Sequence, residues 1–366
     1  MGNFANYLTG KEKSTDYQKF SWLRAIAFVV FVVAVIVCGR IVVVGLPDKQ
    51  ENVWLDTSDL PDENVALATT LANRRTVNLC GVTVQPLGLD RNVAIKNTLS
   101  LLSFFGAKNI PVADGATRTL VQPQAQVDDR YKVGDLGLSD NGKNYTEANN
   151  ILSMRNAILS LPKDEKITII ALTPLTTTAV LLKNYPEVAP KIARIIFMGG
   201  AINVPGTQTK DAEFNIYQDP EAFEVVKNSG VPLVMIPLDL TQSLKLSRED
   251  FEPLLNSDKE ELVQIGRFID QISKSREEFK GEVAPIHDMV CVQYLTNPEN
   301  FKGYYADVEV IKTGEQRGKI TVTPKEDGSK GGVYILSECS EENFIKTFKQ
   351  HLDALTEYIY YFKVQK

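Results

Sequence analysis

Short strand-like runs alternate with amphipathic helical segments over most of this chain. The runs at 76–84, 167–172 and 194–198 are rich in Val and Ile and have the length of buried strands. Residues 91–105 place apolar side chains at helical spacing, and 174–186 begins with a proline, which suits the first turn of a helix. Apolar strands that alternate with helices are typical of a mostly parallel sheet. The sequence therefore predicts an α/β fold with a mostly parallel, Rossmann-like central sheet and helices on both faces.

The last third of the chain continues this plan. Residues 258–279 and 340–362 are long amphipathic helical segments, and 304–336 has the pattern of short strands in an edge hairpin or meander. Ligands of such sheets bind beyond the carboxyl ends of the parallel strands. The polar loops expected to meet at that edge are 56–63, 172–177, 198–201 and 239–241.

Composition narrows the range of partners. The chain has 366 residues, enough for a large core, and a formal net charge of −6 without a basic run. Such a charge argues against a nucleic-acid partner, because no basic field would attract phosphates. The four cysteines form no CxxC pair and are predicted to be small packing residues.

The first 46 residues differ from the rest. Residues 25–39 carry no charge and are flanked by Arg24 and Arg40. A membrane span needs about 20 apolar residues, and the run reaches that length at residue 46 if Arg40 extends its charge to the interface. Abundant Val and Ile leave a buried strand pair as the alternative, and a cleaved signal peptide fits poorly because no small-x-small site follows. The predicted division is a polar leader at 1–20, one transmembrane helix at 21–46 and a globular domain at 47–366.

Four basic residues lie just before the apolar run, and only Arg40 and Lys49 lie close to its other end. The four are Lys11, Lys13, Lys19 and Arg24. This asymmetry predicts an N-terminus in the cytosol or matrix and a globular domain across the membrane. Asn144 begins an Asn-Tyr-Thr glycosylation motif, so a glycan there would indicate a secretory lumen.

Residues 53–73 contain a cluster of acidic residues between a strand-like run and a helical segment. Asp56, Asp59, Asp62 and Glu63 lie within eight residues, a density that indicates a metal or sugar site. The chain has two histidines; His351 lies in the middle of a predicted helix, whereas His287 is followed by Asp288 at the start of another.

Several segments, in order, resemble the inosine-uridine nucleoside hydrolase family from about residue 51 to the end. The matching segments are ALTPLTTTAVLLKNYPEVAPKIARIIFMGGAI, AEFNIYQDPEAFEVV, PLDLT and PIHDMVCVQYLTNPENF. The resemblance implies the nucleoside hydrolase fold and the hydrolysis of a ribonucleoside to base and ribose. It also implies a Ca²⁺ ion held by carboxylates and a backbone carbonyl, an aspartate that deprotonates a bound water, and an acid such as histidine for the departing base.

The acidic loop departs from the family pattern, which reads Asp-Thr-Asp-Pro-Gly-x-Asp-Asp-Ala. Asp56 and Asp62 match it, whereas Ser58 stands where the resemblance implies the aspartate that is both base and calcium ligand. Glu63 stands at a metal-ligand aspartate, one methylene longer, and Leu60 replaces the glycine of a tight turn. Catalysis is therefore expected to be lost at Ser58.

The resemblance assigns further positions. His287 is the expected acid, and Glu63, Asp288 and the Leu172 carbonyl are the remaining metal positions. Thr177 replaces an asparagine, and Gly88 stands near a sugar-contacting asparagine. No cofactor is expected, with Ca²⁺ as the ion if a metal site persists. The ribose-binding positions that remain are Asp62, Met198, Glu213 and Asn215.

Three functions are open at this stage. The favoured one is an inactive, membrane-anchored accessory subunit of a larger membrane complex, because a serine without a neighbouring base cannot deprotonate water. Degenerate anchored chains of this kind resemble, in plan, accessory subunits of ciliate mitochondrial respiratory complex I. The alternatives are an active calcium-dependent purine or pyrimidine nucleoside N-ribohydrolase and a nucleoside-binding sensor.

The favoured function predicts a cellular location and a set of partners. It implies a single-pass protein of the mitochondrial inner membrane with its domain on the intermembrane-space side, or else of a secretory membrane with a lumenal domain. The expected partners are membrane lipid, other subunits of the complex and a homologous nucleoside-hydrolase-like chain as a dimer partner.

Overall fold

The computed structural model describes residues 50–87, 89–122, 127–138, 150–276, 279–326 and 329–364. The predicted leader and transmembrane helix lie outside these residues, so the division of the chain at residues 20 and 46 stays a prediction. Asn144 and its glycosylation motif also lie outside them. No helix within the described ranges is both long and apolar enough to cross a membrane.

A nine-stranded sheet with the order β10-β9-β11-β6-β5-β4-β1-β2-β3 organises the described chain. All neighbouring strands from β11 to β3 are parallel, and β9 runs antiparallel to both β11 and β10. The mostly parallel sheet and the edge hairpin predicted from the sequence are thus confirmed. The strands are β1 (Glu51–Thr57), β2 (Val77–Val84), β3 (Val112–Asp114), β4 (Ile167–Ala171), β5 (Ile192–Met198), β6 (Leu233–Ile236), β9 (Lys302–Val310), β10 (Ile320–Pro324) and β11 (Val333–Glu338).

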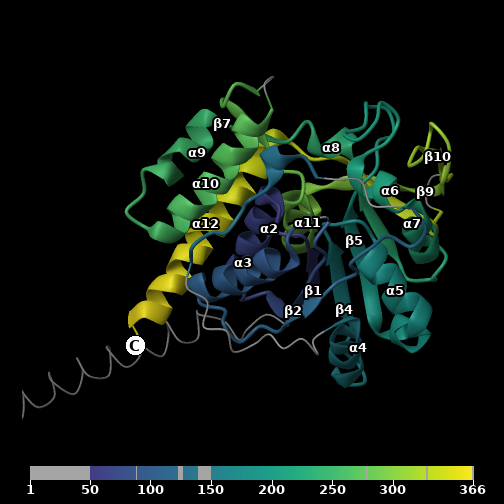
Figure 1. Cartoon of the computed structure of the whole chain (residues 1–366), viewed down its shortest axis with the longest axis horizontal. Helices are drawn as coiled ribbons and strands as arrows, with labels where there is room; N and C mark the ends of the chain where they lie inside the picture. The colour runs from purple at the N-terminus through teal and green to yellow at the C-terminus, as the bar shows by residue number, and fades with distance from the viewer. Residues whose placement is uncertain are drawn as a thin grey trace, which may run out of the picture. The chain divides into compact units, whose positions relative to one another are not determined.

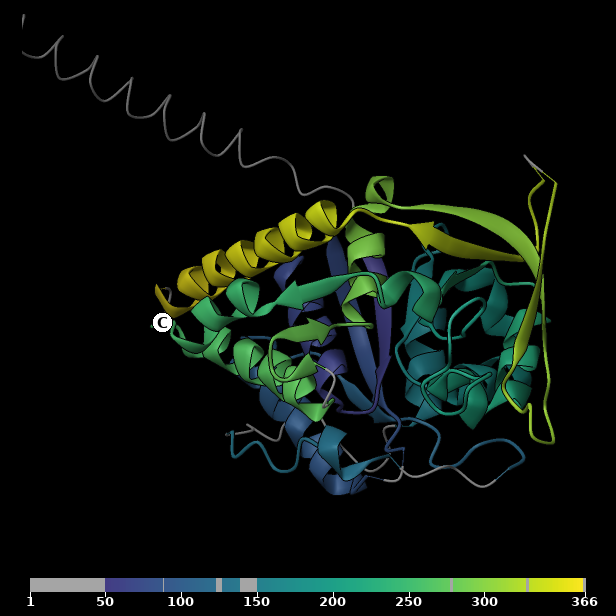
Figure 2. The ribbon, with the colours of Figure 1, turned by 90° about the horizontal axis from the view of Figure 1, so that it is seen from above.

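Helices cover both faces of this sheet (Figures 1 and 2). One face packs on α2 (Pro61–Ala72), α3 (Arg91–Phe104) and α11 (Met289–Thr296). The helices α10 (Glu260–Ser275) and α12 (Glu341–Val364) lie against α2 in the same hydrophobic core, and α9 (Arg248–Leu255) lies against α10. The other face packs on α4 (Ile151–Ser160), α5 (Thr176–Asn184) and α7 (Pro220–Lys227). The short elements α6 (Phe214–Gln218) and α8 (Leu238–Thr241) follow β5 and β6, and β7 (Lys245–Ser247) pairs with β8 (Val283–Pro285).

Strand β1 shows how the sequence pattern produces the two layers. Val53 and Leu55 are fully buried in the core that contains α2, whereas Trp54 between them is buried in the opposite core. This division follows from the period of two along a strand. Because both faces are covered, the strand is apolar throughout, and its first loop emerges between two hydrophobic layers.

Candidate active site

The loops after β1, β4 and β5 meet at the carboxyl edge of the sheet because these strands are neighbours. Asn215, in α6, donates from Nδ2 to the carbonyl oxygen of Leu172 at 2.9 Å and to that of Met198 at 3.1 Å. One buried amide therefore joins the ends of β4 and β5. Asp239, in the short helix α8 after β6, accepts from the backbone amides of Ile202 and Asn203 at 2.8 and 2.7 Å. The polar loops converge at this edge as the sequence predicts.

The first acid of this edge, Asp56, ends β1 and is fully buried. Its Oδ1 accepts from the Thr83 hydroxyl at 2.6 Å, which links β1 to β2, and its Oδ2 lies 3.4 Å from the Thr173 hydroxyl. Burial raises the pKa of Asp56 to about 7, against the lowering effect of these hydroxyl donors. Asp56 therefore fastens the loop to its neighbouring strands.

Ser58 and Glu63 form a closed pair within the acidic loop. The Ser58 hydroxyl lies 2.7 Å from Oε1 and 2.8 Å from Oε2 of Glu63. Glu63 Oε2 also accepts from the Thr57 hydroxyl at 2.9 Å, from the Leu60 amide at 3.3 Å and from the Ser58 amide. Burial raises the pKa of Glu63 to about 7. The Glu63 carboxylate, which stands at an expected metal-ligand position, thus receives its hydrogen bonds from residues of its own loop.

Asp59 turns away from this pair, and the loop's tight turn falls on it. Its φ of 74° is left-handed, whereas Leu60 is extended with a φ of −84°. Leu60 itself is therefore unstrained, and the left-handed turn falls on an aspartate, a residue type that tolerates this conformation better than most. Asp59 accepts from Asn64 Nδ2 at 2.9 Å and from Asn97 Nδ2 at 2.7 Å, and burial raises its pKa to about 8. This contact with Asn97, whose Oδ1 accepts from the Leu136 amide at 3.0 Å, connects the loop to residues 127–138.

His287 and Asp288 precede α11 and are both buried. His287 Nδ1 lies 2.8 Å from the Thr241 hydroxyl oxygen, and burial, followed by the charges of Arg276 and Lys245, lowers the pKa of His287 to about 3. Asp288 hydrogen-bonds to the half-buried Asp62. Its pKa is raised well above the ordinary value by burial and then by the charges of Asp62 and Glu63.

The predicted ribose-side residues lie at the same edge. Glu213 is buried at the start of α6, where Oε2 accepts from the Gly200 and Ile216 amides at 3.0 Å and Oε1 accepts from the Asn215 amide at 2.7 Å. Burial raises the pKa of Glu213. Its charge also contributes to the raised pKa of Asp288, so Glu213 lies in the electrostatic neighbourhood of that carboxyl group.

Residues missed by sequence reasoning complete the edge. Gln85, directly after β2, accepts at Oε1 from the Thr177 hydroxyl at 2.9 Å, and Thr177 in turn accepts from the Ala116 amide at 3.1 Å. Thr177 thus joins three loops in place of the family's asparagine. The place of Gln85 immediately after a buried strand could have identified it. Gly88 lies outside the described residues.

Some polar atoms of this edge have no protein partner. Gln85 Nε2, His287 Nε2 and Asp288 Oδ1 are buried without a hydrogen bond. Buried polar groups are ordinarily paired, so such atoms mark a place where a ligand or water is expected. The roles assigned to these positions from the sequence stay predictions.

A calcium ion does not fit the donor set as it lies. Over the described ranges, no group of three or more His, Cys, Asp or Glu residues is placed to hold a metal ion. The oxygens of Glu63 accept from Ser58 and Thr57, and the Leu172 carbonyl accepts from Asn215. Calcium usually takes about six to eight oxygens. The expectation that no cofactor is bound, or calcium if any, stays a prediction.

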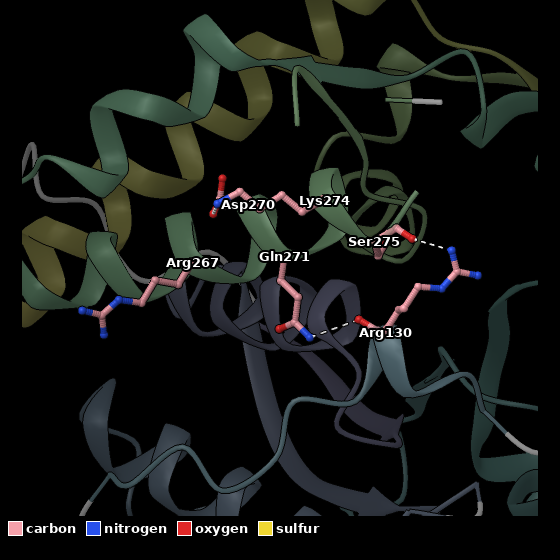
Figure 3. Close-up of a pocket in the computed structure, with 6 residues that line it drawn as sticks. All are labelled: Arg130, Arg267, Asp270, Gln271, Lys274 and Ser275. Atoms are coloured by element: carbon pink, nitrogen blue, oxygen red, sulfur yellow. Dashed lines mark hydrogen bonds and ion pairs between the residues drawn. The ribbon is translucent and has the colours of Figure 1, made fainter. Parts of the chain in front are cut away.

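A separate surface pocket lies along α10, where residues 127–138 dock. Figure 3 shows that the guanidinium groups of Arg267 and Arg130 point away from each other. They are therefore not placed to bind the same anion. Arg130 Nη1 donates to the Ser275 carbonyl at 3.1 Å, and Gln271 Nε2 donates to the Lys132 carbonyl at 3.0 Å. The pocket is a docking seam between a loop and a helix. Its lining residues are Arg130, Arg267, Asp270, Gln271, Lys274 and Ser275.

Comparison with known proteins places this edge in context. The family model described as inosine-uridine preferring nucleoside hydrolase matches residues 53–346. The pyrimidine-specific ribonucleoside hydrolases RihA of Citrobacter koseri and of Escherichia coli are each 29% identical, over 80% and 82% of this chain and 94% and 97% of their own length. A plant nucleoside hydrolase and a purine-preferring ribonucleoside hydrolase from Gardnerella vaginalis have the same fold. Their TM-scores are 0.74 and 0.73 at 23% and 20% identity, over 83% of this chain and 99% of theirs.

These matches correct the function favoured from the sequence. The relatives that align along nearly their whole length are named as ribonucleoside hydrolases, so the inactive accessory subunit of a respiratory complex was the wrong choice. A single substitution, at Ser58, does not by itself show that the activity is lost. Asp62 and Glu63 nevertheless lie close enough to Asp288 for their charges to raise its pKa.

The expected localisation is corrected with it. A single-pass protein of the mitochondrial inner membrane or of a secretory membrane was inferred from the apolar run at 25–46, which precedes the matched residues 53–346. The matched proteins are named as hydrolases and not as membrane or respiratory subunits. An apolar run indicates that a segment is hydrophobic, but it does not identify the cellular compartment of the protein. The homologous dimer partner stays a prediction.

Proposed function

Because the chain belongs to the inosine-uridine preferring nucleoside hydrolase family, we propose that it hydrolyses the N-glycosidic bond of a purine or pyrimidine ribonucleoside. The observation that carries the proposal is the convergence of acids from two distant segments. Asp62 and Glu63 come from the β1 loop, Asp288 comes from the start of α11, and their charges act on one another. Glu213 faces this group from α6.

Each part of the edge has a task in this reaction. Asp62, Glu213 and Asn215 provide the carboxylate and amide groups suited to ribose hydroxyls. Water adds to C1′ of the ribose while the bond from C1′ to the base nitrogen breaks. The base leaves with the bonding electron pair and takes up a proton from solvent, while the proton of the attacking water stays on the protein, so free base and ribose are the products.

Ser58 and Glu63 are the proposed route for the water proton. A serine alone is no base, but its hydroxyl donates to Glu63 at 2.7 Å. Ser58 can accept the proton of the attacking water as it passes its own proton to Glu63. The pKa of Glu63, raised to about 7 by burial, suits a base that works near neutral pH. No step of this route passes through a metal ion, since the donor set does not fit one.

The test measures release of free base and reducing sugar from inosine, uridine and cytidine by the full-length chain. We expect hydrolysis, and we expect Glu63→Gln to lower kcat by about 10²–10⁴, the usual contribution of a general base. Glu249→Gln, at an exposed position in the first turn of α9, is the matched control and should retain full activity. Saturable nucleoside binding without base release would contradict the proposal and leave a binding function.

A further inference from the structure

We propose that this chain does not use the family's calcium ion, because the hydrogen-bonded pair of Ser58 and Glu63 replaces it. The resemblance places a metal ligand at each of these two positions. In this structure both side chains are turned toward each other instead. The inference rests on the family membership and on these contacts, and it is independent of whether the chain hydrolyses nucleosides.

The proton between these two side chains belongs to Ser58. Ser58 donates its hydroxyl proton to Glu63, at 2.7 and 2.8 Å from the two carboxylate oxygens. An aspartate at residue 58 would bring a second negative charge to this point, and a cation would be needed to hold the two carboxylates together. A serine brings a donor, so the pair is stable without a cation.

The side chain of Glu63 is long enough to reach back to Ser58. Glu63 is the third residue of α2, and from there its longer side chain bends back to the residues before the helix. Glutamate suits this position because it can accept hydrogen bonds from residues at the N-terminal end of the helix. It accepts from Thr57 Oγ at 2.9 Å and from the Leu60 amide at 3.3 Å in addition to Ser58. The extra methylene and the serine are therefore complementary changes.

Other oxygens of this edge are hydrogen-bonded within the protein. The Leu172 carbonyl, the expected backbone ligand, accepts from Asn215 Nδ2 at 2.9 Å. Asp59 accepts from Asn64 and Asn97 and points away from Ser58. Asp288 Oδ1 is the one fully buried carboxylate oxygen without a hydrogen bond among the described side chains of this edge. One such oxygen is far from the about six to eight that calcium usually takes.

The experiment follows thermal unfolding of the full-length chain in chelator and in millimolar calcium. Wild-type protein should unfold at the same temperature in both. Ser58→Asp should unfold at a lower temperature in chelator, and calcium should raise that temperature by at least about 3 °C, because a ligand of the folded state stabilises it. Ser58→Asn has the size of aspartate without its charge, and it should lose stability without any response to calcium.

Equilibrium dialysis of the wild-type chain against radioactive calcium gives a second readout that needs no folded variant. We expect no saturable calcium binding below millimolar concentration. Saturable binding, or a wild-type unfolding temperature that rises with calcium as it does in Ser58→Asp, would overturn the inference. A calcium response equal in Ser58→Asn and Ser58→Asp would also overturn it, because charge at residue 58 would then not be the deciding feature.

Discussion

The hydroxyl of Ser58 donates to the carboxylate of Glu63 from five residues earlier in the chain, at 2.7 Å from Oε1 and 2.8 Å from Oε2. Both side chains are buried. The contact closes the loop that joins β1 to α2 and fixes Glu63 at the base of the site. The loop is thus held by an internal hydrogen bond at the point where the family resemblance implies a metal ion.

Loss of this hydroxyl should measurably destabilise the fold. Ser58→Ala removes a donor to a buried carboxylate, and hydrogen bonds to charged groups contribute about 1.5–3 kcal/mol. Urea unfolding should show a loss of that size. Ser160→Ala, at the exposed end of α4, removes a hydroxyl that donates to the Ala157 carbonyl and should change the free energy of unfolding by less than about 0.5 kcal/mol. Equal effects of the two variants would contradict this view of the pair.

Stability should fall as pH rises above neutral. The folded pKa values of Asp56 and Glu63 are about 7 and that of Asp59 is about 8, all raised above the ordinary values by burial. The folded chain therefore retains protons that the unfolded chain has already released, so the free energy of unfolding decreases as pH passes through these values. The buried histidines contribute little above pH 6.5, their ordinary pKa.

Urea unfolding between pH 6.5 and about 8.5 tests this dependence. The free energy of unfolding should fall by a few kcal/mol across that window, since each pKa unit corresponds to about 1.4 kcal/mol. Asp59→Asn removes the acid with the highest of the three values and should flatten the slope, whatever it does to absolute stability. A slope unchanged in that variant would show that Asp59 does not titrate in this range.

A side chain at residue 200 should be tolerated less well than one at residue 230. Its φ is +92°, and a Cβ there would lie 2.1 Å from Cε of Met235, which is fully buried. The Gly200 amide also donates to Glu213 at 3.0 Å. Gly230 has a similar φ of +80° with nothing within 4 Å of a built Cβ, so Gly230→Ala reproduces the backbone strain without the clash.

Gly200→Ala should therefore cost about 1–3 kcal/mol more than Gly230→Ala in thermal or urea unfolding, the usual cost of overpacking a core. If hydrolysis is observed, kcat/KM should fall in Gly200→Ala and remain unchanged in Gly230→Ala. A result in which both variants behave alike would mean that Met235 moves aside and Glu213 stays in place.

Arg317 should anchor the helix that carries Asn215. This guanidinium is 8% exposed; Nη1 and Nη2 pair with the Glu221 carboxylate at 2.9 and 3.0 Å, and Nε and Nη2 donate to the carbonyls of Tyr217 and Gln218 at 3.1 Å. These carbonyls lie at the end of α6, so the β9–β10 turn holds that helix from behind.

Removing one partner of a buried ion pair costs about 3–5 kcal/mol, because the other charge is left uncompensated. Arg317→Ala should lose that much in urea unfolding, and Arg317→Lys should recover only part of it since it cannot form the two-pronged contact. Lys325→Ala is the control, because its partner Asp307 is 65% exposed and such pairs contribute at most about 1 kcal/mol. An Arg317→Ala loss as small as that of the control would remove its anchoring role.

The layered architecture was accessible from the sequence because it depends on local patterns. The runs at 76–84, 167–172 and 194–198 coincide with β2, β4 and β5 within about two residues, and 340–362 coincides with α12. Burial on both faces requires these strands to be continuously apolar, and such runs are easy to recognise in the sequence. Strand β3 and helix α4 were missed: β3 has only three residues, and two residues of α4 are buried.

The sequence also determined which residue types stand in the acidic loop, including Ser58 and Glu63, and the order of segments that identifies the family. It could not determine where those side chains point. The tertiary structure decided three features of the site. Glu63 turns back to Ser58, and Asp59 rather than Leu60 takes the left-handed turn. Asn215 donates a hydrogen bond to the Leu172 carbonyl. The reason is physical: a buried polar atom must find a partner, and the neighbouring strands and helices decide which partners lie within hydrogen-bonding distance.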